Sequence, residues 1–190
     1  MENKIKKILL ESAKLSATLA NDPKVSRVIG KITQDIVKSL RNGGKVIVFG
    51  NGGSAADSQH FACELIGRFK RQRRSIPAIA LTTNAATLTA IANDYNFNAI
   101  FSRQVCGLGK RGDVAIGIST SGNSQNVLEA IKKANKLKLV TVGITGKSGG
   151  KLKPLCKHAL CVPSSDVPRI QELHAIAIHV IAELVEEFCQ

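Results

Sequence analysis

Five short apolar runs recur along the chain and predict the strands of a β-sheet. They are KVIVFG (45–50), AIALT (78–82), DVAIGIS (113–119), VTVGIT (140–145) and HALCVP (158–163). Each run is rich in β-branched residues and apolar nearly throughout, which is typical of strands that are covered on both faces. Helical stretches separate the runs, so the pattern predicts βαβ units and a five-stranded parallel sheet.

The helical stretches predict a layer on each face of this sheet and two further helices before it. The segment 21–23, Asn-Asp-Pro, separates the two amino-terminal helices, and Pro23 suits the first turn of the second one. We expect helices at about 2–20, 24–41, 54–67, 85–92, 98–109, 124–137, 149–156 and 168–188. The chain therefore reads as one three-layer α/β/α domain over residues 1–190.

Composition narrows the class of protein. The 190 residues are 44% apolar and 22% charged, which is ordinary for a globular protein, and no stretch approaches the length of a membrane span. The first residues form an amphipathic pattern rather than a signal peptide, so we expect a cytoplasmic protein without a membrane partner. The five cysteines include no Cys-x-x-Cys pair. This argues against a disulfide framework or a thiolate zinc site, and we expect most of them to be buried.

The net charge of +13 permits nucleic acid, acidic proteins or phosphorylated metabolites as partners. Part of this charge lies in RFKRQRR (68–74), whereas the chain contains one tyrosine and no tryptophan. Because aromatic residues are not interleaved with the basic ones, a stacking platform for single strands is not indicated. We expect a basic, solvated surface that steers a phosphorylated metabolite, and no nucleic-acid partner.

Polar and glycine residues follow each of the first four predicted strands. The segments are GNGGS, TTN, STSGNS and TGKSGG. Parallel sheets bind their ligands beyond the carboxyl ends of the strands, so these loops predict a ligand site at one sheet edge. The pattern does not specify the chemistry of the site.

The segment STSGNS (119–124) is typical of a phosphate-binding turn. Its hydroxyls precede a predicted helix, whose start offers unpaired N–H groups and a positive dipole end. The alternative is that Asn123 or Ser124 merely caps this helix. Several hydroxyls gather where one cap would suffice, which favours a ligand. We assign the phosphate to Ser119, Thr120, Ser121 and Ser124.

GNGGS (50–54) lacks the spacing of a nucleotide-binding loop, and its glycines instead permit a ligand to approach the backbone. His60 and Glu64 follow four residues apart, on one side of the predicted helix. Gln171 and His179 lie about two turns apart on the last helix. All four are acceptable zinc ligands. Spacing alone, however, fits a buried, hydrogen-bonded His60 and a solvated Glu64 better than a metal site.

The order GNGGS, HFACEL, STSGNS and RIQELH resembles the sugar isomerase (SIS) domains, and among them the phosphoheptose isomerases. The resemblance covers essentially the whole chain, and it favours a metal site over a buried His60 and a solvated Glu64. It implies one zinc per subunit, held by residues matching His60, Glu64, Gln171 and His179. It also implies substrate contacts at Asn51, Gly52, Gly53, Glu64, Arg68, Asn93, Asp94, Ser119, Thr120, Ser121, Ser124 and Gln171. His174 faces elsewhere on its helix, and we expect a structural role for it.

The resemblance further implies an aldose–ketose isomerase that converts sedoheptulose 7-phosphate to D-glycero-D-manno-heptose 7-phosphate through an enediol. This is the first step of ADP-heptose and lipopolysaccharide core heptose biosynthesis. Glu64 would be the base at carbon and His179 the partner acid. The implied assembly is a homotetramer, with 1–41 as a helical oligomerisation segment and 42–190 as the α/β core. At Val167-Pro168 the chain departs from relatives that carry an acidic residue, and we assign no role there.

Two alternatives come from other functional classes. A close SIS relative is a non-catalytic tetramer that binds the bacterial replication initiator, but it lacks the counterparts of Glu64 and His179. Both residues are present here, which favours an enzyme. A sugar-phosphate-sensing SIS module of a regulator is the second alternative, and the short chain offers no DNA-binding domain for it.

Overall fold

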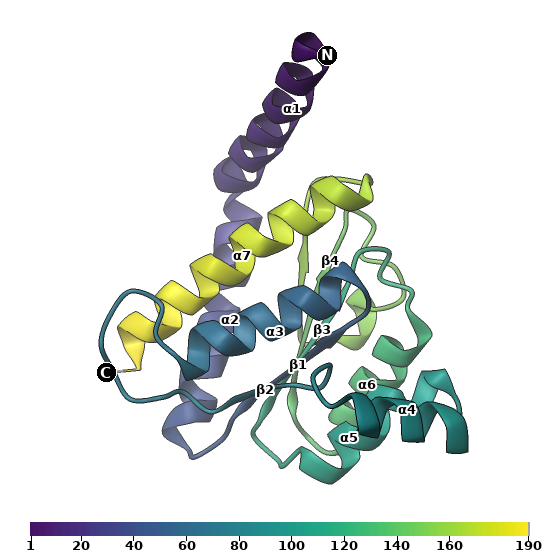
Figure 1. Cartoon of the computed structure of the whole chain (residues 1–190). Coiled ribbons are helices and arrows are strands. Elements are labelled where there is room, and N and C mark those ends of the chain that lie inside the picture. The colour runs from purple at the N-terminus through teal and green to yellow at the C-terminus, as the bar shows by residue number, and fades with distance from the viewer. Residues whose placement is uncertain (190) are drawn as a thin grey trace.

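A five-stranded parallel sheet forms the centre of the computed structural model, which describes residues 1–189 (Figure 1). The strand order is β2-β1-β3-β4-β5, and every neighbouring pair is parallel. The predicted α/β fold with five parallel strands is therefore confirmed. The strands are β1 (Val46–Gly50), β2 (Ala78–Ala80), β3 (Val114–Ser119), β4 (Val140–Thr145) and β5 (His158–Cys161).

Seven α-helices surround this sheet among the described residues, and two short 3₁₀ turns complete the regular structure. The α-helices are α1 (Glu2–Asn21), α2 (Pro23–Arg41), α3 (Gly53–Ile66), α4 (Ala85–Asp94), α5 (Ile100–Leu108), α6 (Gln125–Lys136) and α7 (Val167–Phe188). The 3₁₀ turns are η1 (Phe97–Ala99) and η2 (Lys153–Leu155).

The core consists of one apolar cluster on each face of the sheet. Alternate residues of β1 enter different clusters: Val46 and Val48 pack with α2, α3 and α7, whereas Ile47 and Phe49 pack with α5 and α6. All five residues of β1 are buried. A strand that is apolar throughout is therefore explained by helices covering both of its sides.

The register of the strands brings their carboxyl ends to one edge of the sheet. Gly50 at the end of β1 pairs with Ile118 near the end of β3, and Ser119 pairs with Thr145 at the end of β4. The loops that follow these strands therefore begin side by side. The polar segments after β1, β3 and β4 share this edge, as the sequence predicts.

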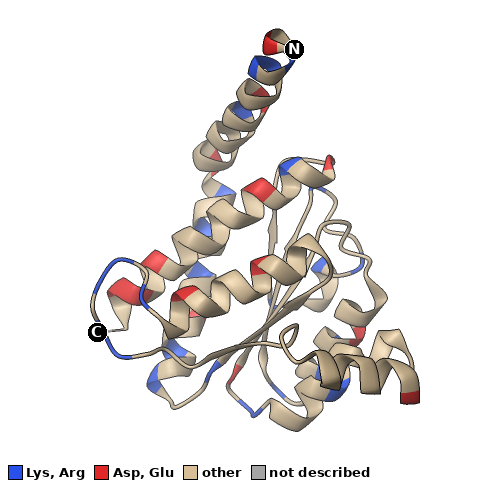
Figure 2. Cartoon of the chain, in the orientation of Figure 1, with Lys and Arg blue, Asp and Glu red and all other residues tan. Residues whose placement is uncertain are grey.

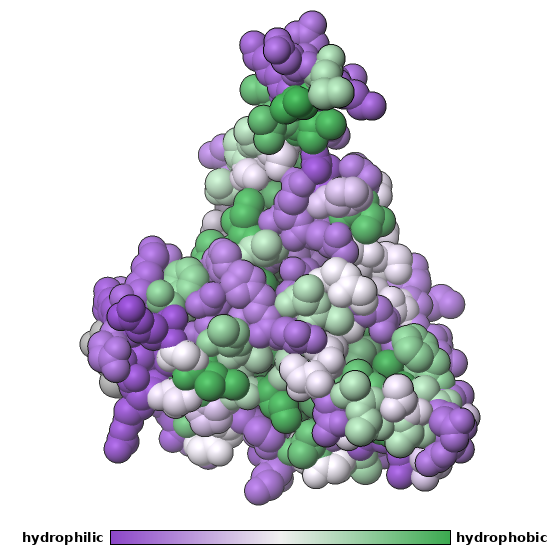
Figure 3. All heavy atoms as spheres, in the orientation of Figure 1, coloured by the Kyte–Doolittle hydropathy of each residue, from purple (hydrophilic) through white to green (hydrophobic). Residues whose placement is uncertain are grey.

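The two amino-terminal helices form where the sequence predicts them. Pro23 occupies the first turn of α2, and the Asp22 side chain accepts a hydrogen bond from the Lys24 backbone N–H at 2.8 Å. α1 projects from the body of the protein and carries apolar side chains on its surface (Figures 1 and 3). Those at least two-fifths exposed are Ile5, Ile8, Leu9 and Leu10.

Some local predictions are wrong. The segment 149–156 forms no α-helix and contains only the 3₁₀ turn η2, because a Gly-Gly pair with left-handed backbone at Gly149 and Gly150 begins it. The expectation of buried cysteines also fails within the described chain, since two are exposed and three are half-buried. Cys63 and Cys106 lie on the surfaces of α3 and α5, whereas Cys189 and Cys156 pack against the margins of the two apolar clusters.

Lysine and arginine residues are concentrated on the loop between α3 and β2 (Figure 2). This loop contains the basic run 68–74. Among the described helices, none combines the length and apolar character that a membrane crossing requires. The division of the domain at residues 41 and 42 stays a prediction.

Candidate active site

His60, Glu64 and His179 meet between α3 and α7. His60 Nε2 lies 2.9 Å from Glu64 Oε1 and 3.2 Å from His179 Nε2. The two imidazole rings stand edge to face, with centroids 4.8 Å apart. His60 is exposed and the other two side chains are half-buried. His60 is therefore accessible to solvent and belongs to a cluster, whereas spacing alone predicts a buried His60.

The donor set of this cluster fits a zinc ion. One ligand atom from each of the three residues lies within 4.8 Å of the other two. A tetrahedral zinc with bonds of about 2.0–2.1 Å separates its ligand atoms by about 3.3 Å. Two of the three separations are close to that value, and two imidazoles with a carboxylate form a typical zinc set. The residues therefore can hold the ion that the sequence resemblance implies.

Gln171 lies about two turns before His179 on α7, and its amide packs against the start of α3. A Cβ added to Gly53 would stand 2.1 Å from the Gln171 Nε2. Gly53 is seven residues before His60, about 10 Å along the helix axis. A side chain at position 53 would therefore displace the Gln171 amide from this contact. A fourth-ligand role for Gln171 stays a prediction.

The GNGGS turn links β1 to α3 through a backbone that favours glycine. Gly52 precedes α3 with a positive φ of +55°. Beside it, the Asn51 side chain exchanges two amide hydrogen bonds of 2.8 Å with Asn126, which is buried in the first turn of α6. This pairing connects the turn after β1 with the turn after β3. The predicted contacts of Asn51, Gly52 and Gly53 with a substrate stay predictions.

The STSGNS turn leaves part of the start of α6 available to a ligand, since in its first turn the Val127 N–H already donates to the Asn126 side chain at 2.9 Å. Ser124 is the N-cap residue of α6, yet within the described chain its side chain makes no capping hydrogen bond. Its hydroxyl instead lies 2.9 Å from the hydroxyl of Ser119 at the end of β3. A helix start with unpaired N–H groups attracts anions. This geometry favours phosphate binding over capping alone.

Gly122 in this turn has no room for a side chain. Its φ is +67°, and a Cβ there would lie 2.2 Å from the Gly149 carbonyl oxygen. We expect Gly122→Ala to weaken inorganic phosphate binding at least about fivefold, since backbone strain costs about 1–3 kcal/mol. Titration calorimetry measures the dissociation constant.

The control for this prediction is Gly107→Ala in α5. A Cβ at Gly107 meets no atom of residues 1–189 within 4 Å, so phosphate affinity should not change. An unchanged dissociation constant in Gly122→Ala would contradict the assignment of the phosphate to this turn.

Three further predicted substrate contacts lie on exposed surfaces. Asn93 and Asp94 end α4, which contacts α5 and η1, and the Asn93 amide donates to the Asp94 carboxylate at 3.0 Å. Arg68 is exposed just after α3. The structure does not bring Asn93 and Asp94 to the His60 cluster within one chain, and all three roles stay predictions.

The structure adds residues near the site that the sequence interpretation missed. The Phe69 ring lies 5.5 Å from the His179 ring between centroids, and Arg73 forms an ion pair with Glu186. Asp57, one turn before His60, has a pKa raised to about 6, because burial outweighs the lowering effect of His60. The sequence of a basic run does not indicate which of its members is buried, so the burial of Arg73 could not be predicted from the local sequence.

Comparisons with known proteins extend over most of the chain. A family model described as the SIS domain matches residues 13–146. The phosphoheptose isomerase of Aquifex aeolicus is 51% identical over 98% of this chain and 97% of that protein. Phosphoheptose isomerase 1 of Campylobacter jejuni is 52% identical over 84% and 86% of the respective chains. A solved phosphoheptose isomerase from Neisseria gonorrhoeae superposes with a TM-score of 0.91, at 38% identity over 98% of both chains.

Proposed function

The chain belongs to the phosphoheptose isomerases of the SIS-domain family, and we propose how its own residues carry out their reaction. It is an aldose–ketose isomerase that converts sedoheptulose 7-phosphate to D-glycero-D-manno-heptose 7-phosphate. The observation that carries the proposal is the meeting of His60, Glu64 and His179 between two facing helices. This cluster combines a carboxylate base with imidazoles that can exchange protons.

The isomerisation moves a proton from C1 of the ketose to C2 through an enediol. Glu64 is the proposed base, which takes the proton from C1 and returns it to C2. His179 transfers the opposite proton at the substrate oxygens, so that one oxygen is protonated as the other loses its proton. The half-buried position of both side chains supports these roles, since each can reach a ligand and remains partly shielded from water.

The phosphate group is proposed to bind the hydroxyls and N–H groups of residues 119–124. The unused N-cap position of α6 supports this assignment. Binding there is separate from the proton transfers, so its free energy aligns the sugar carbons with Glu64. Asn51, Gly52 and Gly53 would contact the sugar along the turn after β1.

Zinc is the proposed resident ion, held by His60, Glu64 and His179 with Gln171 as the predicted fourth ligand. When bound, zinc would polarise the substrate carbonyl and stabilise negative charge on the oxygens. A carboxylate in contact with a metal is a weaker base, so the double role of Glu64 requires a flexible coordination sphere. Both roles come from the family resemblance.

Removal of the metal should inactivate the enzyme reversibly. We expect dialysis against a chelator to lower turnover about tenfold or more, because carbonyl polarisation contributes several kcal/mol. Added zinc should restore both the activity and a metal content of one ion per subunit. Turnover that is indifferent to chelation would contradict the metal assignment.

The activity itself is tested by incubating the purified protein with sedoheptulose 7-phosphate and following aldose formation by NMR. Conversion in the presence of zinc is the expected result, and its absence would contradict the function. The comparisons give no support to the non-catalytic, initiator-binding alternative, since the relatives described above are named phosphoheptose isomerases.

We also propose that the protein is a cytoplasmic homotetramer that acts in heptose biosynthesis. The exposed apolar residues of α1, among them Ile5 and Leu9, support burial of this helix between subunits of a homotetramer. The cytoplasmic location and the place at the start of ADP-heptose and lipopolysaccharide biosynthesis rest on the family resemblance. We assign no nucleic-acid partner, because the site accounts for a phosphorylated substrate.

A further inference from the structure

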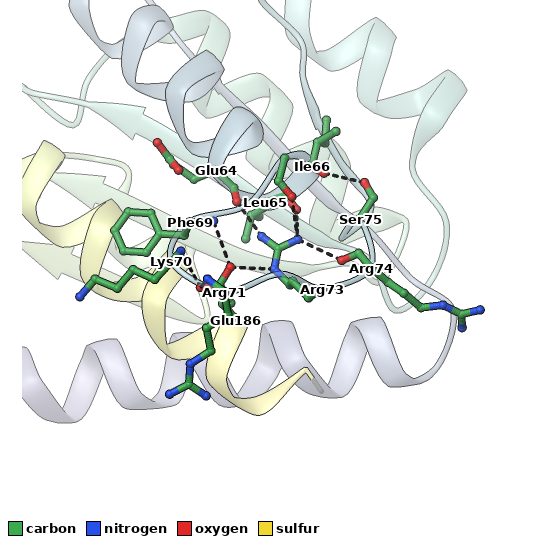
Figure 4. A network of polar contacts seen from close by, with 11 residues as sticks. Glu64, Leu65, Ile66, Phe69, Lys70, Arg71, Arg73, Arg74, Ser75 and Glu186 are labelled. Atoms are coloured by element: carbon green, nitrogen blue, oxygen red, sulfur yellow. Dashed lines mark hydrogen bonds and ion pairs between the residues drawn. The ribbon is translucent and has the colours of Figure 1, made fainter.

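Arg73 and Glu186 form a buried ion pair beside the candidate active site (Figure 4). Arg73 belongs to the basic loop after α3, and Glu186 lies near the end of α7. The Arg73 Nε lies 3.0 Å from Glu186 Oε1, and the two side chains are only 6% and 2% exposed. The pair therefore differs from Lys70 and Glu183, an ion pair between the same two segments whose side chains are about half exposed.

The Arg73 guanidinium binds the carboxyl end of α3. Its NH2 group donates to the carbonyl of Glu64 at 2.8 Å, and its NH1 group donates to the carbonyls of Leu65 and Gly67 at 2.8 and 3.1 Å. The last carbonyls of a helix have no partner within the helix, and the planar fork of arginine can satisfy several at once. One of these acceptors belongs to the proposed catalytic base.

The Glu186 carboxylate binds the loop that follows α3. It accepts hydrogen bonds from the consecutive backbone N–H groups of Phe69, Lys70 and Arg71, at 3.0, 2.8 and 2.9 Å. Successive N–H groups that surround an anion form a nest. Burial by itself raises the pKa of Glu186, but these donors and Arg73 outweigh it and hold the pKa below its usual value. The carboxylate is therefore charged at neutral pH.

These contacts connect both sides of the proposed site. Glu186 follows His179 by seven residues, about two turns of α7. The nest around Glu186 holds the backbone of Phe69, whose ring packs against the imidazole of His179. Arg73 holds the backbone of Glu64 on α3. The Arg73–Glu186 ion pair thus joins α3, which carries Glu64, to α7, which carries His179. The loop that contains Arg73 also contacts the His179 ring, through Phe69.

We propose that Arg73 and Glu186 are positioning residues, which set the separation of Glu64 from His179 and the orientation of the His179 ring. The inference rests on the proposed function for the roles of those two residues. A metal site and a proton-transfer pair both require their atoms to be held within about 0.5 Å of the productive geometry. A purely structural pair would instead affect only the amount of folded protein.

The test compares zinc affinity and kinetics in two variants, Glu186→Gln and the double variant Arg73→Met/Glu186→Leu. The double variant leaves neither charge buried and unpaired, whereas a single removal does. It also removes the partners of the loop N–H groups and of the α3 carbonyls, so its folded fraction is measured beside that of the unaltered protein. Zn²⁺ affinity is measured by competition with a chelator. kcat and KM are measured with sedoheptulose 7-phosphate, below the onset of thermal unfolding.

We expect both variants to bind Zn²⁺ about 10- to 100-fold more weakly, the range for partners that orient metal ligands. kcat should fall by a similar factor while KM stays near its original value, because the phosphate turn at 119–124 is not altered. Loss of folded protein would instead reduce the number of zinc sites without changing their affinity. The matched control is Glu183→Gln, which should change neither quantity.

Unchanged Zn²⁺ affinity and kcat in either folded variant would overturn the proposal. So would a kcat loss that disappears once rates are divided by the number of zinc sites. If the double variant does not fold, Glu186→Gln decides the question. Failure of the unaltered protein to isomerise the substrate would contradict the proposed function, whereas Zn²⁺ affinity would still report on the positioning role.

Discussion

Replacing Glu64 with glutamine should lower kcat for sedoheptulose 7-phosphate by roughly 10²- to 10⁴-fold, the usual contribution of a positioned acid or base. The amide keeps the size of the side chain but cannot take a proton from C1. NMR detection of aldose formation measures the rate. Inorganic phosphate should still bind, since residues 119–124 are separate from α3 in the chain and lie at the start of α6.

The control for this variant is Glu129→Gln, which alters an exposed carboxylate on α6 that pairs with Lys132. Its turnover should equal that of the unaltered enzyme. Near-normal turnover in Glu64→Gln would remove Glu64 from the mechanism. Loss of phosphate binding in the same variant would show that the substitution disturbs more than proton transfer.

His174 should make the protein less stable in mild acid. The side chain is fully buried in α7, and within residues 1–189 neither ring nitrogen has a hydrogen-bond partner. Burial lowers the pKa of His174 to about 4, and the nearby Thr145 backbone offsets only part of that shift. The unfolded chain therefore binds a proton below about pH 6.5 that the folded chain does not bind until about pH 4.

Because the unfolded state binds more protons in this window, the free energy of unfolding should fall as the pH falls from 6.5 to 4. The full loss from His174 is about 3 kcal/mol, at 1.36 kcal/mol per pKa unit. His174→Met should lack this part of the loss. Urea unfolding of both proteins at pH 7 and pH 4.5, at equal protein concentration, measures the difference.

The difference in unfolding free energy between the unaltered protein and His174→Met isolates the contribution of His174, because the other titrating groups are the same in both proteins. Asp57 and Glu186 have shifted pKa values in opposite directions, and their contributions cancel when the variant is subtracted. Stability curves that remain parallel from pH 7 to pH 4.5 would contradict the low pKa of His174.

Local pattern predicts most of the fold because each strand and helix has its own physical signature. Runs such as VTVGIT are apolar on both faces, and β4 occupies the predicted residues 140–145. Pro23 begins α2 as expected, since its fixed φ suits a first helical turn. The segment 149–156 misled the prediction because a Gly-Gly pair can adopt left-handed backbone that no helix uses.

The candidate site is predictable only in part. The STSGNS and GNGGS turns can be recognised in the sequence, because hydroxyl-bearing residues and glycines follow predicted strands there. His60 and Glu64 share a helix face by spacing alone. Their meeting with His179 could be expected only from the family resemblance, since 119 residues separate the two histidines whose nitrogens lie 3.2 Å apart.

The amino-acid pattern was sufficient for the α/β architecture and for the polar loops that share one edge of the sheet. These follow from periodicity and from the chemistry of each side chain, both of which are local. Burial of Arg73 was decided only by the tertiary structure, because its partner Glu186 lies 113 residues further along the chain. Arg71 and Arg74 carry the same charge in the same run and remain exposed. An arginine of this run is buried only where the fold places a carboxylate beside it. The local sequence does not indicate which arginine that is.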